Sequence, residues 1–397
     1  MTSGSLRRIL VIAGYWPTRE NSITGVFVVQ QVAAMARLGH KVTVLLTKTI
    51  GRDASPFLSV DELGLPPCRI TIDVVNVARF PEVLSHCLGA LKFNSALAGL
   101  CYSRKIKNLD TALGPFQGCF VHGARYASLS LGTWSKKLSC GVVNVIHGVD
   151  PLLNNLIENN PDTALLRASS ERSKAVVLVG SPLKRYASAL GVPTDKQVVV
   201  GNGTDIPDVT ECHVSSYLKR DSVKLISVSN LIKLKGVDQN LSALSLVAER
   251  RPDLNFEYTI IGDGPERSGL KTLAVTLGIS GRVRFWGRIP YAETMSEICD
   301  SDVFTLPSWG EAFGIVYLEA MARYKPVIGC YKNGAEDIFE HGKQGFLIKP
   351  HDINALSLYL ERLIEDGSLR HTMGREGRIT AERHTWEANA KKMLGLL

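Results

Sequence analysis

The chain has 397 residues, of which 45% are hydrophobic and 21% are charged, and it carries eight cysteines. This length suffices for two domains with separate cores, and the lack of eighteen consecutive apolar residues excludes a predicted membrane-spanning helix. The cysteines show no CxxC or Cys/His ligand spacing, which argues against a structural zinc site and favours reduced, buried thiols in a cytoplasmic protein.

The net charge of +8 is concentrated in the first half of the chain. Residues 1–200 hold 22 lysines and arginines against 12 aspartates and glutamates, a net charge of +10, and the remainder carries −2. This asymmetry predicts that the first half meets an anionic partner: nucleic acid, an anionic membrane surface or a lipid-phosphate acceptor. A charge that serves only solubility is the alternative.

Strand and helix patterns alternate through the first half. The apolar run after Arg7 and Arg8 is too short for a signal peptide and is expected to form the first buried strand, ending at Ala13. An amphipathic helix over Val26–Leu38 and a second strand over Lys41–Thr47 complete a βαβ unit. Further strands are expected at Ile70–Val77, Gly118–His122, Val142–His147, Ala175–Val179 and Gln197–Val200. The pattern predicts a doubly wound α/β domain that binds ligands at the carboxyl ends of its strands.

A second alternating series follows Ile206–Ser222, which lacks periodicity and is expected to be a linker. Its strands are expected at Val223–Val228, Phe256–Ile261, Arg282–Phe285, Val303–Leu306, Val327–Cys330 and Phe346–Ile348. The final segment, Thr385–Leu397, is expected to be a helix. We therefore predict two Rossmann-like domains, 1–204 and 205–384, that face each other across a cleft.

The most informative stretch is Pro307–Pro326, where a strand leads into a loop, a turn at Gly314 and a helix over Ile315–Ala322. A helix N-terminus offers unpaired N–H groups and partial positive charge, which favour a phosphate. Glu311 and Glu319 would then bind hydroxyl groups on either side of the phosphates. Together these features predict a nucleotide-sugar site, whereas two carboxylates at this spacing are by themselves more often solvated surface groups.

The sequence of this stretch, PSWGEAFGIVYLEAMARYKP, closely resembles the donor-site motif of the retaining glycosyltransferase family 4, which has the GT-B fold. The resemblance implies a last helix that crosses back to the first domain, and transfer with retained configuration that needs no metal or other cofactor. It also implies a nucleotide-sugar donor, a glycan or lipid-linked acceptor as in surface-polysaccharide or teichuronic-acid synthesis, and no nucleic-acid partner. The location implied is cytoplasmic, with peripheral attachment to the inner face of the membrane.

The resemblance assigns most donor contacts to the second domain. Lys235 would neutralise the diphosphate and Glu311 would orient the sugar, so both are expected to be catalytic. Asn230 stands where many family members have arginine and cannot supply that charge, which leaves the charge to Lys235 or weakens activity. The implied donor-binding residues are Gly25, Asn230, Gly264, Arg288, Ile289, Phe313, Gly314, Ile315, Val316 and Glu319. Asp263, which precedes Gly264 and Pro265, is expected to cap a helix that begins near Pro265.

The first domain would complete the site. Gly25 begins the first helix, where a glycine allows close approach of a phosphate or, more simply, a turn. His147, in an HGVD sequence, matches a family histidine that lines the donor sugar and is expected to be catalytic, although a histidine at a strand end is often structural. Asp150 and His122 are candidate acceptor residues.

Two other functional classes remain open at this stage. One is a non-hydrolysing nucleotide-sugar epimerase on the same fold, and the other is a catalytically silent nucleotide-sugar-binding protein, which Asn230 makes conceivable. A nicotinamide-dinucleotide site is not expected, because the first loop lacks GxGxxG and the second expected strand ends at Thr47 and Lys48 rather than at an acidic residue.

Overall fold

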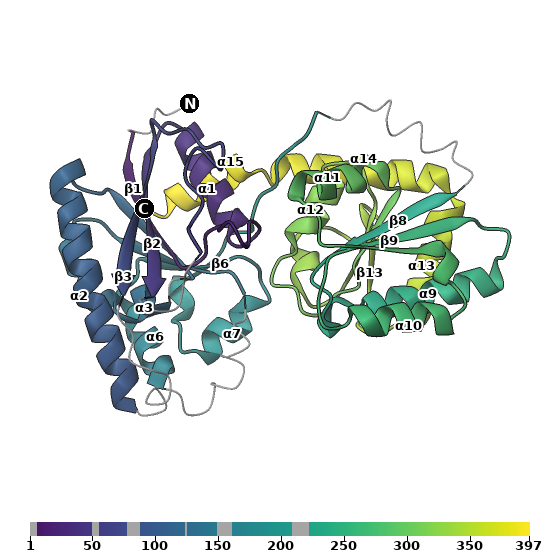
Figure 1. The fold of residues 1–397 in the computed structure, drawn as a ribbon, viewed down its shortest axis with the longest axis horizontal. Helices are drawn as coiled ribbons and strands as arrows, with labels where there is room; N and C mark the ends of the chain where they lie inside the picture. Colours follow the sequence, from purple (N-terminus) through teal and green to yellow (C-terminus); the bar gives the residue numbers. More distant parts are fainter. Residues whose placement is uncertain (1–5, 50–54, 78–87, 124, 149–160, 209–221) are drawn as a thin grey trace. The chain divides into compact units, whose positions relative to one another are not determined.

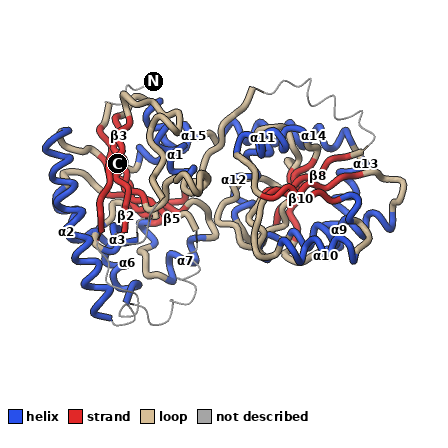
Figure 2. Tube along the Cα trace, viewed as in Figure 1, coloured by secondary structure: helices blue, strands red, loops and turns tan. Residues whose placement is uncertain are grey.

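The computed structural model describes residues 6–49, 55–77, 88–123, 125–148, 161–208 and 222–397. The chain divides into two compact units, one of Met1–Asn202 with Trp386–Leu397 and one of Gly203–Thr385. Each unit contains a parallel sheet with helices on both faces (Figures 1 and 2). Most of the expected linker, residues 209–221, lies outside the described residues.

The first unit is built on a seven-stranded sheet in the order β3-β2-β1-β4-β5-β6-β7, and every pair is parallel. Its strands are β1 Arg8–Ala13, β2 Lys41–Thr49, β3 Ile70–Val77, β4 Gly118–His122, β5 Val142–Ile146, β6 Ala175–Leu178 and β7 Gln197–Val199. Its helices are α1 Val26–Arg37, α2 Leu88–Leu113, α3 Arg125–Leu129, α4 Leu131–Trp134, α6 Pro161–Arg172, α7 Leu183–Ala189 and α15 Trp386–Gly395, with 3-10 turns η2 Ser135–Lys137 and η3 Thr194–Lys196.

The last helix, α15, belongs to the first unit and packs beside α1 (Figure 1). A buried hydrogen bond joins the two helices, from Gln31 Nε2 to Asn389 Oδ1 at 2.7 Å. The Asn389 amide also donates to the carbonyl of Gly201 at 2.8 Å. Because both amide groups are buried and paired, they fix the position of α15 at little desolvation penalty. The predicted return of the last helix to the first domain is confirmed.

The second unit has a six-stranded parallel sheet in the order β10-β9-β8-β11-β12-β13. Its strands are β8 Val223–Val228, β9 Phe256–Ile261, β10 Val283–Gly287, β11 Val303–Thr305, β12 Val327–Cys330 and β13 Gly345–Ile348. Its helices are α9 Val237–Arg250, α10 Arg267–Thr276, α11 Tyr291–Asp300, α12 Ile315–Met321, α13 Ile353–Glu365 and α14 Gly367–Arg383, with 3-10 turns η4 Lys233–Lys235, η5 Ser280–Arg282 and η6 Gly334–Asp337.

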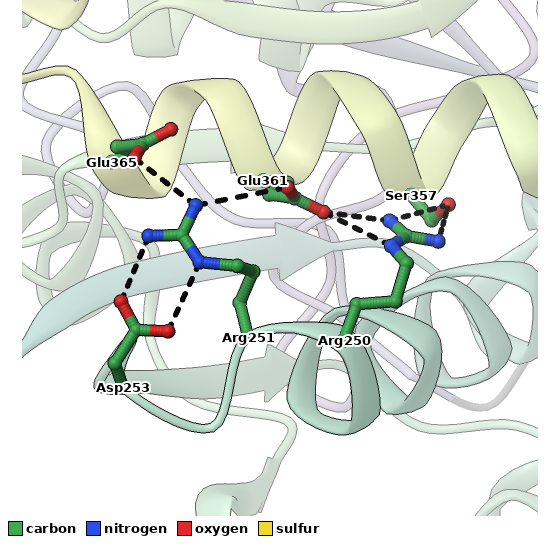
Figure 3. Close-up of polar contacts among 6 residues, drawn as sticks. All are labelled: Arg250, Arg251, Asp253, Ser357, Glu361 and Glu365. Carbon is green, nitrogen blue, oxygen red and sulfur yellow. Dashed lines mark hydrogen bonds and ion pairs between the residues drawn. The ribbon is translucent and has the colours of Figure 1, made fainter.

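Helices α9, α10 and α13 cover one face of this sheet (Figure 1). Outside the core, an ion-pair network joins the end of α9 to α13 (Figure 3). Arg250 Nη2 lies 2.8 Å from Glu361 Oε2, and Arg251 Nη1 lies 3.0 Å from Glu365 Oε1. Arg251 also pairs with Asp253 at 2.8 Å and thereby lowers the pKa of that carboxyl. The network orients the two helices, but solvent and salt screen it.

Every strand expected from the sequence is present, with ends that differ by at most two residues. The predicted cap at Asp263 is wrong, because α10 begins at Arg267 and its N-cap residue is Glu266. The Asp263 carboxylate instead accepts the N–H of Gly264 at 2.8 Å and pairs with Arg267 at 3.3 Å. The turn at Gly264 and Pro265 therefore separates the acidic side chain from the helix that it was expected to cap.

Each sheet has one point where the chain connections reverse direction. In the first unit this point lies between β1 and β4, and in the second unit between β8 and β11. Loops that leave neighbouring strands here run to opposite faces of the sheet and open a crevice at the carboxyl ends, which is where α/β sheets of this kind bind ligands.

Gly262 provides a test of this local geometry. Its φ is 131°, and a Cβ would lie 1.8 Å from the carbonyl oxygen of Ser229 at the end of β8. We expect Gly262→Ala to lower the free energy of unfolding by ~1–3 kcal/mol from backbone strain alone. Gly269, inside α10, has open space within 4 Å of the position that a Cβ would take, so Gly269→Ala is the matched control and should stabilise by ~0.5–1 kcal/mol. Urea unfolding of both variants measures the two changes in the free energy of unfolding, which should have opposite signs. Equal changes would contradict the backbone strain expected at Gly262.

Candidate functional site

The site in the second unit is formed by two loops at the reversal point of the sheet, 229–236 after β8 and 306–314 after β11. The N–H of Trp309 and the hydroxyl of Ser308 both donate to the carbonyl of Leu234, at 3.0 Å each. Gly236, with φ 67°, lies so close to the second loop that a Cβ would come within 2.5 Å of the Pro307 oxygen. The two loops are therefore packed backbone to backbone and position their side chains together.

Lys235 and Glu311 meet across these loops. Lys235 Nζ donates to Glu311 Oε1 at 2.5 Å, and the side chains are only 18% and 13% exposed. The N–H of Gly334 donates to the backbone carbonyl of Glu311 at 3.0 Å, which fixes the backbone of Glu311. Charge-assisted hydrogen bonds of this kind are short and strong. The two residues were expected to contact different parts of a ligand, and here each is the other's partner.

Gly314 shapes the start of α12. It has φ 92° and ψ 61°, a left-handed conformation, and a Cβ there would lie 2.6 Å from the Tyr317 ring. Ile315 and Val316, in the first helical turn, are half-buried. Their N–H groups have no carbonyl within the helix to bond. Phe313 is 3% exposed, so its ring belongs to the core.

Glu319 lies on α12 and accepts a hydrogen bond from the Tyr291 hydroxyl at 2.9 Å. Burial raises the pKa of Glu319, and the hydrogen bond from Tyr291 and the charge of Arg323 partly oppose that shift. Burial together with the carboxylate likewise raises the pKa of Tyr291. Tyr291 follows Pro290 as the first residue of α11, and the sequence contained no pattern that could have identified it as a partner of Glu319.

The other expected donor residues lie at neighbouring strand ends. Asn230 is exposed in the loop after β8. Two glycines of the loop after β9, Gly262 and Gly264, pack closely against the backbone of its neighbours Ser229 and Leu231. In particular, a Cβ at Gly264 would lie 2.4 Å from the Leu231 oxygen. Arg288 is exposed and Ile289 half-buried in the turn after β10. These four expected donor residues lie at the same edge of the sheet as the Lys235–Glu311 pair, because the strands that they follow are parallel neighbours.

In the first unit, Gly25 is the N-cap residue of α1 with φ 75°. A Cβ there would lie 2.6 Å from the Tyr15 carbonyl carbon and 2.8 Å from the Trp16 nitrogen. The chain's own loop therefore requires glycine at this position, independently of any ligand. Trp16 is held in turn by a hydrogen bond from its Nε1 to the carbonyl of Leu58 at 3.1 Å.

His122 and His147 meet at the ends of β4 and β5, near the reversal point of the first sheet. His122 Nδ1 lies 2.9 Å from His147 Nε2, and the rings are stacked with centroids 5.1 Å apart. The Phe27 ring packs against His147 at 4.3 Å. Burial lowers the pKa of His122 to about 3, and burial with the neighbouring His122 ring lowers the pKa of His147 well below its usual value. Asp150, the other acceptor candidate, lies outside the described residues.

Both histidines were candidate site residues from the sequence, but with separate expected roles: His147 was expected to be catalytic and His122 to contact the acceptor. A signal for their pairing was present, because each ends one of two consecutive expected strands and parallel neighbours end at the same edge of a sheet. β4 and β5 are indeed adjacent, with His122 opposite Val145. The aromatic residues that pack near the pair, Tyr15 in the loop after β1 and Phe27 in the first turn of α1, were not singled out, because a single aromatic residue has no distinguishing pattern.

The lowered pKa values predict a pH dependence of stability. Unfolding returns each histidine to a pKa near 6.5, so below that pH the unfolded chain binds more protons than the folded chain. We expect the stabilisation to be complete above about pH 6.5 and to fall towards pH 3 by up to ~1.4 kcal/mol per pH unit for each histidine. Hydrogen exchange of the β4 and β5 amides at pH 7.5 and 5.5 measures this, and His122→Asn should remove about half of the slope. An unchanged slope in the variant would contradict the assignment.

Three further findings concern the described residues as a whole. No group of three His, Cys, Asp or Glu side chains within them is arranged to hold a metal ion. The cysteines among them are free thiols. None of the helices that the structure describes is long and apolar enough to cross a membrane.

The arrangement in the second unit suits a ligand with an anionic centre and hydroxyl groups on either side. Lys235 supplies a cation, and the first turn of α12 supplies N–H groups. Glu311 and Glu319 supply carboxylate oxygens that can accept hydrogen bonds from hydroxyl groups. The histidine pair in the first unit supplies neutral nitrogen atoms that can donate or accept a hydrogen bond.

Two family models match the chain. Residues 24–203 match the glycosyl transferase 4-like domain, and residues 208–380 match glycosyl transferases group 1. A D-inositol 3-phosphate glycosyltransferase of Corynebacterium urealyticum is 36% identical over 182 residues, which cover 44% of this chain and 43% of that protein. An N-acetyl-alpha-D-glucosaminyl L-malate synthase of Bacillus anthracis is 29% identical over 250 residues, 60% of this chain and 62% of that protein. The alignments thus span about two fifths to three fifths of these relatives' lengths.

Solved structures share the fold over nearly the whole chain. Anabaena HepE in complex with UDP has a TM-score of 0.71 at 17% identity and covers 98% of both chains. Sucrose-phosphate synthase from Thermosynechococcus elongatus has a TM-score of 0.72 at 19% identity, again with 98% of both chains covered. At these identities the similarity establishes the fold.

Proposed function

The chain belongs to the GT-B glycosyltransferases of family 4, in which a glycosyl transferase 4-like domain precedes a glycosyl transferases group 1 domain, and on this premise we propose that it is a glycosyltransferase. It transfers a sugar from a nucleoside-diphosphate sugar to a hydroxyl group of an acceptor. The observation that carries the proposal is the Lys235–Glu311 pair, held at the reversal point of the second sheet beside the start of α12.

The second unit holds the donor in this proposal. The diphosphate contacts Lys235 and the amides of Gly314, Ile315 and Val316, and Glu319 accepts hydrogen bonds from the ribose hydroxyls. On binding, Lys235 exchanges part of its contact with Glu311 for the diphosphate, which leaves the Glu311 carboxylate available to the hydroxyls of the sugar. A UDP complex of HepE, a protein of the same fold, supports a nucleotide ligand for this fold.

In this proposal the first unit binds the acceptor, and His147 hydrogen-bonds the transferred sugar. We propose front-face attack with retained configuration: the bond from the sugar C1 to the phosphate oxygen breaks, and a bond from C1 to the acceptor oxygen forms on the same face. The departing phosphate takes the acceptor's proton. Lys235 and backbone amides, which are fixed before the reaction, stabilise the charge that develops on the phosphate, so no metal is required.

We further propose that the acceptor is lipid-linked or a polysaccharide precursor, reached at the cytoplasmic face of a membrane. The support is the charge of +10 on residues 1–200, to which exposed basic residues of α2 and η2 contribute: Arg104, Lys107, Lys136 and Lys137. Each basic residue near an anionic surface contributes ~1 kcal/mol. Co-sedimentation with vesicles of increasing anionic-lipid content tests this. Binding that does not change with either the anionic-lipid content or the salt concentration would overturn it.

A panel of nucleotide sugars tests the proposed activity. Thermal stabilisation identifies the donor by mass action, and release of nucleoside diphosphate with an extract-derived acceptor measures transfer. Conversion of the nucleotide sugar to an epimer would indicate an isomerase instead. Donor binding without turnover under every acceptor condition would indicate a silent nucleotide-sugar-binding protein.

A further inference from the structure

His122 and His147 form a polar pair inside an otherwise tightly packed part of the first unit. His122 is fully buried at the end of β4. One ring nitrogen of each histidine is used in the mutual contact at 2.9 Å, and the two outer nitrogens, His122 Nε2 and His147 Nδ1, are buried with no hydrogen-bond partner among the described residues. A buried polar atom that lacks a partner loses its hydration without compensation and so destabilises the fold. Such an atom in a native structure needs an explanation, and a bound ligand group is one.

The surrounding residues restrain the rings. Phe27 packs on His147, and Tyr15 packs edge-on against Phe27 with centroids 6.3 Å apart. Gly123, directly after His122, has φ 56°, and a Cβ there would lie 1.9 Å from Tyr15 Cε2. Glycine at this position therefore lets the Tyr15 ring approach the end of β4. The contact with Phe27 and the hydrogen bond to His122 therefore restrain the His147 ring.

The geometry limits the tautomers that the pair can adopt. A neutral imidazole carries one N–H, so a hydrogen bond between His122 Nδ1 and His147 Nε2 contains a single proton. If that proton is on His122 Nδ1, the His147 proton must be on its own Nδ1, and both rings are Nδ1–H tautomers. If it is on His147 Nε2, the His122 proton must be on Nε2, and both rings are Nε2–H tautomers. A mixed pair would place two lone pairs or two protons between the rings.

We infer that His122 is a positioning residue that sets whether Nδ1 of His147 donates or accepts a hydrogen bond toward a hydroxyl group of the substrate. This deepens the proposed function, since it rests on the proposed hydrogen bond from His147 to the substrate. The two outer nitrogens always have opposite character: one is a donor and the other an acceptor. Since burial holds the pKa of both rings low, the pair stays neutral at physiological pH.

Isotopic labelling of histidine tests the tautomer rule on the intact chain without any assay of activity. Long-range 15N–1H spectra distinguish Nδ1–H from Nε2–H rings, and His122→Asn and His147→Asn spectra assign the two signals. We expect both rings to be neutral at pH 7.5 and to share one tautomer. One ring in each tautomer, or a protonated ring, would overturn the inference whether or not the chain transfers sugar.

Two nearly isosteric substitutions test the role in turnover. The Asn amide in His122→Asn can replace Nδ1 as the partner of His147, whereas His122→Leu cannot. We expect His122→Leu to lower kcat at least ~10-fold with the donor KM within ~3-fold, and His122→Asn to retain most of kcat. Equal kcat in both variants would overturn the positioning role. Should His122→Leu fail to fold, the tautomer of His147 in His122→Asn decides, since the inference requires it to stay fixed.

Discussion

Replacing Lys235 with methionine is expected to lower kcat at least ~10-fold, because the leaving diphosphate loses the cation that neutralises it, and single preorganised donors of this kind are worth up to ~10²–10³ in kcat. Lys235 is the cation that the two packed loops hold against Glu311. Steady-state kinetics with the donor identified from the panel measure the effect. Lys233→Met is the matched control: it removes the same charge from the same 3-10 turn, but at an exposed side chain.

A loss of the ion pair alone could mimic this result, since Lys235→Met leaves the partly buried Glu311 carboxylate without its partner. The double variant Lys235→Met/Glu311→Gln, compared with Glu311→Gln alone, separates the two causes. We expect the double variant to recover thermal stability, because no unpaired charge remains, while its kcat stays well below that of Glu311→Gln. Equal kcat in the double variant and in Glu311→Gln would show that Lys235 serves only the fold.

The second large effect is expected for Glu319→Ala, which should abolish measurable donor binding. Hydrogen bonds to a charged group contribute ~1.5–3 kcal/mol each, so losing the contacts to two ribose hydroxyls would weaken binding by ~10²–10⁴. The change also leaves the Tyr291 hydroxyl without the acceptor that it has now. Isothermal titration with UDP, GDP and ADP measures the loss on whichever diphosphate the unmodified chain binds.

Tyr291→Phe is the control for that experiment, because it removes the 2.9 Å hydrogen bond and keeps the carboxylate. If Glu319 binds ribose directly, Tyr291→Phe should weaken binding far less than Glu319→Ala. Equal losses of affinity in the two variants would show that the ribose contact depends on the hydrogen-bonded Tyr291–Glu319 pair. Unchanged affinity in both variants would show that Glu319 does not contact the donor. Since the pKa of Glu319 is raised, donor affinity should also decline as pH falls through that pKa.

The architecture was predictable because it depends on residue patterns that repeat. Buried parallel strands are short apolar runs, so β8, β9 and β12 were located to the residue. Helix starts were less predictable, as the loop at Gly264 shows. There a carboxylate that satisfied the pattern of an N-cap instead bonds the next amide in the chain. Local capping preferences cannot decide between two nearby N–H groups when a turn intervenes.

The positions of the candidate site residues were predictable only as far as a motif fixes positions along the chain. The segment containing Glu311, Gly314 and Glu319 could be assigned because these residues lie within one strand–loop–helix unit. The partner of Glu319 could not be assigned, because Tyr291 comes from another helix. The order of the strands placed His122 and His147 at one edge of the sheet, but it did not show that their rings are in contact. Which side chains meet across strand ends depends on packing, and periodicity carries no information about it.

The placement of α15 in the first unit has a consequence for biosynthesis. Gln31 in α1 precedes the whole of Gly203–Thr385 in the chain, and its buried partner Asn389 follows it. At ~5–20 residues per second, translation of that segment takes ~10–40 s. During this interval the nascent first unit presents the uncovered side of α1, so α15 packs on α1 only after Gly203–Thr385 has been synthesised. Chaperone capture during synthesis is therefore expected at α1.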